Sequence, residues 1–149
     1  MKQNRTGAPA QKSSFRSRAA VATVTGVMQP PPTTAGQDDH VAAAVYLMKH
    51  TGTTALMVVN EQTGQPAGII TQADVARAIA DGKNLNDVRV YTAMITRPAI
   101  STTTSLRDAA EIMAAGRFRH LPVAGDAGLL GVIDVTDVCR ALSKLEAAG

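Results

Sequence analysis

The stretch GVIDVTDVCRAL, residues 131–142, restates a phrase that stands 63 residues earlier as GIITQADVARAI, residues 68–79. Each phrase joins an apolar run typical of a short strand to a polar residue and then to apolar positions at helical spacing. The offset between the copies changes only where loops are expected, and this indicates two copies of one supersecondary unit. When the two copies are aligned, the matched positions include Met28 with Met94, Met48 with Met113, Leu56 with Leu121 and Gly68 with Gly131.

The second copy is predicted to begin its first helix after Ser105, with Asp108 three residues on completing an approximate capping box. Gly116 is expected to close that helix. The segment HLPVAGDAGLLGVID, residues 120–134, has two apolar runs around a turn and predicts a hairpin. A last helix is expected from about Val135, with Cys139 among apolar residues and therefore predicted to fill the core. The copy thus has the order β-α-β-β-α.

The first copy gives the same order, with a helix from about Asp39 to His50, strands over 55–60 and 66–70, and a helix from Thr71. A copy of this length buries little apolar surface alone. The predicted fold class is therefore α/β (α+β), with two β-α-β-β-α repeats packed through their sheets as one module.

Charge divides the chain into a tail and a body. Residues 1–20 hold five basic side chains and no acidic one, whereas the remainder holds ten basic and twelve acidic, so the net charge of +3 comes from the tail. The tail has no apolar periodicity and is predicted to be disordered. A solvated tail is favoured over contact with nucleic acid.

Composition disfavours several functional classes. The single Cys suits a reducing compartment, and there is neither an apolar run of about 20 residues nor a secretory leader, so a cytoplasmic protein without membrane contact is expected. The three histidines and one cysteine have no metal-ligand spacing, and no nucleophile elbow, Walker loop or dinucleotide-binding loop is present. The sequence predicts neither an enzyme nor a metal protein.

FRHLPVAGDAGLLGVIDVTDVCRAL, residues 118–142, resembles the end of a CBS domain, and YTAMITRPAISTTTSLRDAAEIM, residues 91–113, resembles its beginning. The resemblance spans about residues 21–147 and both copies share it. It implies a tandem CBS pair, or Bateman module, that forms a homodimer and binds an adenosine-containing ligand in a cleft between repeats. The predicted division is a tail over 1–20, repeat 1 over 21–83 and repeat 2 over 84–149.

The candidate ligand-binding residues are Thr71, Asp74, Arg119, His120 and Asp137. Free N–H groups at a helix start attract phosphate, and the Thr71 hydroxyl can donate to it. Asp74 can accept both hydroxyls of a ribose, while Arg119 and His120 offer positive charge to phosphate oxygens. Thr71 and Asp74 also fit a plain helix cap. Asp137 is the equivalent of Asp74 in the second copy, and Arg77 and Arg140 are expected to be i,i+3 partners of Asp74 and Asp137.

The two sites are expected to be unequal. Asp134 stands where the first copy has Thr71, and a carboxylate there repels phosphate. The intact Thr-x-x-Asp lies in copy one and the intact Arg-His in copy two, so a cleft that joins them gives one complete site and one degenerate site. Two alternatives are that Asp134 suits a neutral nucleoside or a cation, and that neither site binds.

The predicted function is a regulatory sensor of AMP, ADP, ATP or S-adenosylmethionine that acts on an unknown regulated protein. The alternative is a ligand-free dimerising scaffold.

Overall fold

The computed structural model describes residues 22–148. The elements in chain order are η1 (Val24–Gly26), β1 (Thr34–Gly36), α2 (Val41–Thr51), β2 (Ala55–Val59), β3 (Pro66–Thr71), α3 (Gln72–Ala80), α4 (Val90–Ala93), β4 (Ile95–Thr96), α5 (Leu106–Gly116), β5 (His120–Gly125), β6 (Gly128–Asp134) and α6 (Val135–Ala148). The predicted β-α-β-β-α order is confirmed in the first copy. In the second copy, the leading strand is reduced to one parallel bridge between Ile100 and Val123.

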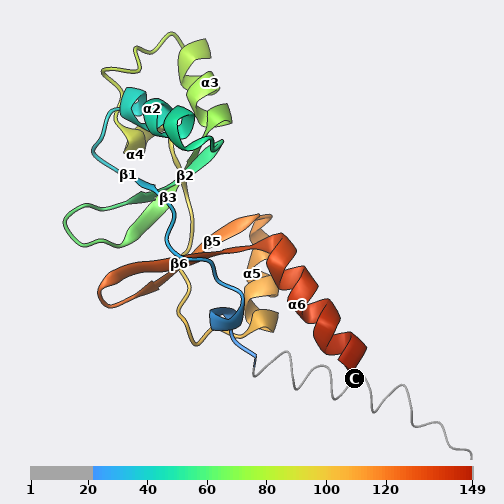
Figure 1. The fold of residues 1–149 in the computed structure, drawn as a ribbon. Coiled ribbons are helices and arrows are strands. Elements are labelled where there is room, and N and C mark those ends of the chain that lie inside the picture. Colours follow the sequence, from blue (N-terminus) through green and yellow to red (C-terminus); the bar gives the residue numbers. More distant parts are fainter. Residues whose placement is uncertain (1–21, 149) are drawn as a thin grey trace, which may run out of the picture. The chain divides into compact units, whose positions relative to one another are not determined.

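The chain divides into two compact units (Figure 1). The α2–α4 unit contains residues 29–100 and 122–132, and the α5–α6 unit contains the described parts of residues 1–28, 101–121 and 133–149. The units do not follow the repeats, because the outer part of the β5–β6 hairpin belongs to the α2–α4 unit. The domain boundaries inferred from the sequence stay a prediction, and the predicted tail over 1–20 lies outside the described residues.

The α2–α4 unit contains a four-stranded sheet in the order β1-β2-β3-β4. β1 runs parallel to β2, with Ala35 opposite Val58, and β2 runs antiparallel to β3, with Leu56 opposite Ile70. β4 closes the sheet, with Ile95 opposite Ile69. β4 is short and exposed, and it is not predicted from the sequence because a two-residue strand leaves no periodicity to detect.

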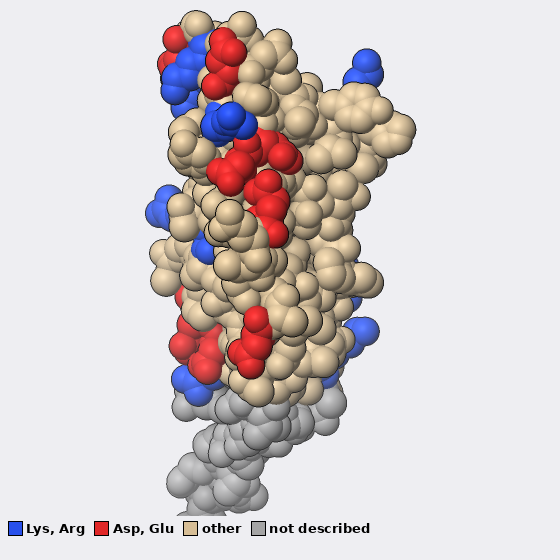
Figure 2. Space-filling view, turned by 90° about the vertical axis from the view of Figure 1, so that its left-hand side faces the viewer, with Lys and Arg blue, Asp and Glu red and all other residues tan. Residues whose placement is uncertain are grey.

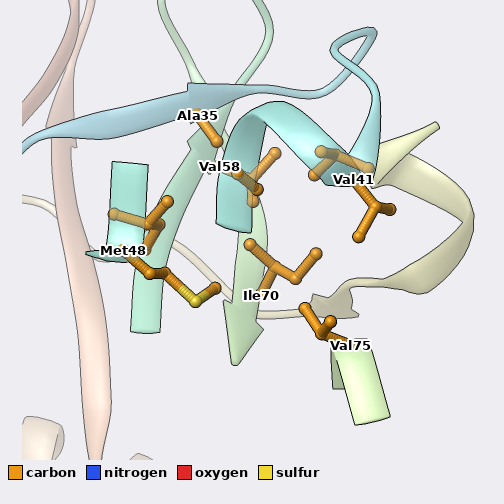
Figure 3. Packing of buried hydrophobic residues seen from close by; sticks show 9 residues of the cluster. Ala35, Val41, Met48, Val58, Ile70 and Val75 are labelled. Atoms are coloured by element: carbon orange, nitrogen blue, oxygen red, sulfur yellow. The ribbon is translucent and has the colours of Figure 1, made fainter. Parts of the chain in front are cut away.

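Buried aliphatic side chains join this sheet to its helices (Figure 3). β2 and β3 present Val58 and Ile70, both fully buried, and α2 presents Val41 and Met48. α3 adds Val75. Such side chains make close contact without polar atoms to satisfy, so the core holds β3 and the start of α3 in fixed relation. The turn from β3 into α3 is therefore the best-supported part of the predicted ligand site.

In the α5–α6 unit the two helices pack side by side (Figure 1). The Ser105 Oγ accepts the Asp108 N–H at 3.0 Å, so the predicted cap of α5 is confirmed. α5 ends at Gly116 as predicted, but the left-handed residue that follows a helix end is the next one. Gly116 is the last helical residue, and Arg117 takes the left-handed conformation at φ 56°. A Cβ at Gly116 would overlap the ring of Phe118, so the glycine makes room for that ring.

Two further expectations differ from the structure. α2 begins at Val41 and not near Asp39, because the Asp39 carboxylate accepts the Gly36 N–H at 2.9 Å and holds a turn ahead of the helix. Cys139, which lies among apolar residues in the sequence, is exposed. Helical spacing explains the latter, since Val138 is fully buried and the next residue along a helix points about 100° away.

Candidate functional site

The start of α3 is a reciprocal capping box built by Thr71 and Asp74. The Thr71 Oγ accepts the Asp74 N–H at 3.2 Å and donates its own hydrogen to the Asp74 Oδ2 at 3.0 Å. The same carboxylate oxygen accepts the Thr71 N–H at 2.8 Å. The arrangement satisfies two backbone donors that a helix start otherwise leaves open.

The other oxygen of the Asp74 carboxylate faces an arginine. The Arg77 Nη1 donates to the Asp74 Oδ1 at 3.0 Å, which confirms the i,i+3 pair expected from the sequence. The Asp74 side chain is 1% exposed and the Arg77 side chain 63% exposed. The guanidinium thus lies on the solvent side of a buried carboxylate. Among the hydrogen-bond partners of this carboxylate in the described residues, it is the one that can move without disturbing the helix.

One donor at the start of α3 remains available. The Gln72 N–H donates to the Thr54 carbonyl at 3.0 Å, and the Asp74 N–H is taken by Thr71. Within residues 22–148, the Ala73 N–H has no acceptor among the bonds of the structure, and Ala73 is exposed. An open N–H at the positive end of a helix is suited to an anion.

The start of α6 uses the same framework with a different first residue. The Val135 N–H donates to the Arg119 carbonyl at 2.8 Å, as Gln72 does to the matched Thr54. The Asp134 Oδ1 accepts the next N–H, that of Thr136, at 2.6 Å. Asp137 pairs with the Arg140 Nη1 at 3.1 Å, again as expected from the sequence. Its side chain is 27% exposed, whereas that of Asp74 is buried.

His120 has a partner that the sequence analysis did not assign. Its Nε2 lies 3.0 Å from the Asp134 Oδ2, and the two side chains are 44% and 33% exposed. Partial burial acts to raise the pKa of Asp134, but hydrogen bonds from Thr136 and the nearby charges of His120 and Arg119 outweigh it and lower that pKa below 3.8. Asp134 is therefore a firmly ionised carboxylate at the start of α6.

The five predicted site residues fall into two groups. Thr71 and Asp74 lie together in the α2–α4 unit, while Arg119, His120 and Asp137 lie in the α5–α6 unit. A single site built from both groups stays a prediction. The contact between His120 and Asp134 is not predicted from local sequence patterns, because 14 positions separate the two residues. The signal that could have found it is the predicted hairpin over 120–134, which places its first and last residues close together.

The described residues also bear on metal binding, membrane insertion and nucleic-acid binding. No group of three or more His, Cys, Asp or Glu among residues 22–148 is placed to hold a metal ion. In the same range no helix combines the length and the apolar character needed to cross a membrane. On the face drawn in Figure 2 the acidic side chains form separate groups on a mostly uncharged surface. A continuous basic surface suited to nucleic acid is not seen on the described part of that face.

The repeated unit of this chain matches a known protein family. The sequence profile of the CBS domain matches residues 24–81 and residues 87–144, which together make up most of the chain. The chain belongs to the CBS-domain family. The tandem arrangement and the α+β fold class inferred from the repeated phrase are confirmed.

One curated relative is the mitochondrial CBS domain-containing protein CBSX3 of Arabidopsis thaliana. It is 34% identical over 110 residues, which cover 70% of this chain and 53% of that protein. The chain thus spans about half the length of this relative. A smaller fraction is spanned in a second one, the Arabidopsis protein CBSCBSPB3, at 15% of its length.

Solved structures of CBS proteins share the fold. The crystal structure of CBSX2 in complex with AMP has a TM-score of 0.65 and 23% identity, covering 84% of this chain and 98% of that one. A hexameric CBS-CP12 protein from bloom-forming cyanobacteria has a TM-score of 0.65 and 29% identity, covering 80% of this chain and 71% of that one. This CBS pair therefore has the backbone of proteins of which one holds a nucleotide and another assembles into an oligomer.

Proposed function

We propose that this CBS pair is a regulatory module that binds an adenosine-containing ligand such as AMP, ADP, ATP or S-adenosylmethionine and performs no catalysis itself. The observation that carries the proposal is the start of α3, where a buried carboxylate, a hydroxyl and an open N–H lie within one turn. A ribose needs a hydrogen-bond acceptor, and a phosphate needs donors. The complex of CBSX2 with AMP supports this choice of ligand class.

Each group at the start of α3 has a role in this proposal. The Asp74 Oδ1 accepts a ribose hydroxyl once the Arg77 guanidinium swings into solvent. An i,i+3 ion pair with a solvent-exposed arginine contributes about 0.5 kcal/mol, and the ribose hydroxyl then replaces the guanidinium as the donor to the buried oxygen. The Ala73 N–H donates to a phosphate oxygen, and the Thr71 hydroxyl donates to a second one after its hydrogen turns away from the Asp74 Oδ2. The released Arg77 can follow the phosphate as a counter-charge.

Arg119, His120 and Asp137 are proposed as the ligand-binding residues of the second repeat. Arg119 is exposed, and of these three side chains it is the one without a hydrogen bond or ion pair to another described residue. His120 and Asp137 already have partners in Asp134 and Arg140. Single substitutions of the three residues measure their contributions separately from that of Asp74.

The decisive experiment is calorimetric titration of the purified chain with the four ligands, alongside thermal melting. A ligand at a hundred times its dissociation constant stabilises the folded state by about 2.7 kcal/mol. Asp74→Asn should weaken binding at least tenfold, because an amide keeps the shape of the carboxylate but presents an N–H₂ donor in place of one acceptor oxygen. Loss of binding in this variant would place the ligand at α3.

Ser105→Ala is a matched control. It removes a helix cap of the same kind from α5, where the Ser105 Oγ accepts the Asp108 N–H, and it leaves α3 unchanged. It should lower the melting temperature and leave ligand affinity unaltered. If no ligand binds the wild-type chain, the sensor proposal fails and the ligand-free scaffold becomes the better description.

We also propose that the module forms a homodimer, as the family resemblance implies. Large apolar side chains that dimerisation could cover stand exposed on three helices of the α2–α4 unit: Tyr46 on α2, Ile79 on α3 and Tyr91 on α4. The hexameric assembly of the CBS-CP12 protein, which is similar to this chain, supports the proposal that this chain associates with copies of itself. Light scattering coupled to size-exclusion chromatography measures the mass, and a monomer at micromolar concentration would contradict the proposal.

A further inference from the structure

The two helix starts differ in which backbone donor they leave open. At α3 the open N–H is that of Ala73, the second of the helix, because Thr71 takes the third. At α6 the second N–H, that of Thr136, is taken by the Asp134 carboxylate at 2.6 Å. The group that would receive a phosphate in the first repeat is therefore already bound to an anion of the chain in the second.

The surroundings of Asp134 match those of a bound phosphate. One oxygen of its carboxylate accepts a helix N–H, and the other lies 3.0 Å from the His120 Nε2. The charge of Arg119 also acts on it. These are the donor types that hold phosphate groups in proteins: a helix N-terminus, an imidazole and a guanidinium.

We propose that Asp134 is a specificity-determining residue that takes the place of a ligand phosphate at the start of α6, an assignment that rests on the function proposed above. The second repeat then admits adenosine compounds that place no phosphate at this helix, and the phosphate-bearing nucleotide binds at the first repeat. At the start of the helix that follows the hairpin, the two ligand positions differ in the capping residue, Thr71 in the first repeat and Asp134 in the second.

Charge and geometry both enforce the exclusion. A phosphate at the Thr136 N–H would have to displace the carboxylate that holds it and would then lie within about 4 Å of that carboxylate. Two like charges at this distance repel by about 1 kcal/mol in water and about 4 kcal/mol near a protein surface, which weakens binding by roughly fivefold to several hundredfold. Neutral adenosine is not affected by this repulsion.

The test is titration of the full chain with AMP and with adenosine, for the wild type and for Asp134→Thr. The substitution gives the second repeat the hydroxyl of the first and releases the Thr136 N–H and the His120 imidazole. We expect an additional equivalent of AMP, or an AMP affinity at the second repeat at least about fivefold higher, and a change in adenosine affinity of less than about twofold.

Five outcomes of this titration distinguish the proposals. A gain confined to AMP supports the assignment, even if the wild type binds no AMP and the proposed site at α3 fails. Unchanged stoichiometry and affinity for AMP in the variant overturns it, as does an equal gain for adenosine. Two equal AMP sites in the wild type also overturn it, while leaving the sensor function standing. Absence of binding in both proteins contradicts both proposals.

Two further variants serve as controls for Asp134→Thr. Asp134→Asn keeps a good helix-capping side chain and removes only the charge, so it decides the question if Asp134→Thr does not fold. It should change AMP binding in the same direction. Glu146→Gln removes one negative charge about 18 Å further along α6, and it should leave AMP binding as in the wild type.

Discussion

The starts of α3 and α6 are two versions of one sequence phrase, and they differ in whether the first side chain can donate a hydrogen bond. Thr71 donates its hydroxyl hydrogen to Asp74, whose side chain is 1% exposed. Asp134 is ionised and has no hydrogen to give, and Asp137 three residues later is 27% exposed. A single residue at the cap thus separates a buried, fully bonded carboxylate from a half-buried one that pairs only with Arg140 among the described side chains.

The starts of α3 and α6 also differ in how they can bind a ligand. A buried carboxylate in a capping box is held in one orientation, which favours a directed contact with a ligand hydroxyl. A carboxylate at the cap itself instead satisfies the helix start and excludes other anions. The first repeat therefore has the geometry of a ligand site, and the second has the geometry of a site already occupied by its own chain.

The largest expected difference between the two starts is in stability. Asp74→Ala removes three side-chain hydrogen bonds and leaves the Thr71 N–H without its acceptor, so it should lower the free energy of unfolding by about 2–3 kcal/mol. Asp137→Ala removes one part-exposed ion pair and should cost less than about 1 kcal/mol. Urea denaturation of both variants measures the difference, and equal losses would contradict the comparison.

The capping hydroxyl has a smaller effect. Thr71→Val keeps the size and branching of the side chain and removes the Oγ that accepts the Asp74 N–H. Loss of such a cap should cost about 1 kcal/mol. Ser105→Ala should cost a similar amount at α5, since its Oγ makes the equivalent bond. Thermal melting compares the two, and a neutral Thr71→Val would show that the Thr71 hydroxyl does not stabilise α3.

The arginines should matter little for stability and differently for binding. Arg77→Ala and Arg140→Ala each remove an i,i+3 ion pair with an exposed arginine and should change the free energy of unfolding by about 0.5 kcal/mol or less. Arg77→Ala should change nucleotide affinity by several-fold, because Arg77 covers the proposed ribose acceptor. Arg107→Ala, which breaks an exposed pair with Glu111, is the control. Equal AMP affinities in Arg77→Ala and Arg107→Ala would refute the role of Arg77.

The smallest effect concerns acid. The folded-state pKa of Asp134 lies below its ordinary value of 3.8, so the unfolded chain binds the proton more readily than the folded chain. The stabilisation by this carboxylate is complete above that value and is lost as the pH falls through the folded-state pKa. Asp134→Asn should lose less stability than the wild type on acidification. Melting temperatures between pH 6 and pH 3 measure this, and identical curves would contradict it.

The candidate site could be read from the sequence as far as its local contacts reach. Thr71 with Asp74, Asp74 with Arg77 and Asp137 with Arg140 are three residues apart on a helix, where geometry fixes which side chains meet. The partner of His120 could not be read in the same way, because it depends on the register of the β5–β6 hairpin. Whether Thr71 and Asp74 act with Arg119 likewise depends on packing between distant segments.

The sequence by itself determined the duplication, the β-α-β-β-α order of the first repeat, and the residues that begin α3, α5 and α6. These follow from periodicities and capping rules that operate over a few residues. Only the tertiary structure decided that β4 completes the sheet of the first repeat, that Cys139 faces solvent and that Asp134 binds His120. Contacts between residues far apart in the chain are selected by the packing of whole elements, and no local pattern encodes them.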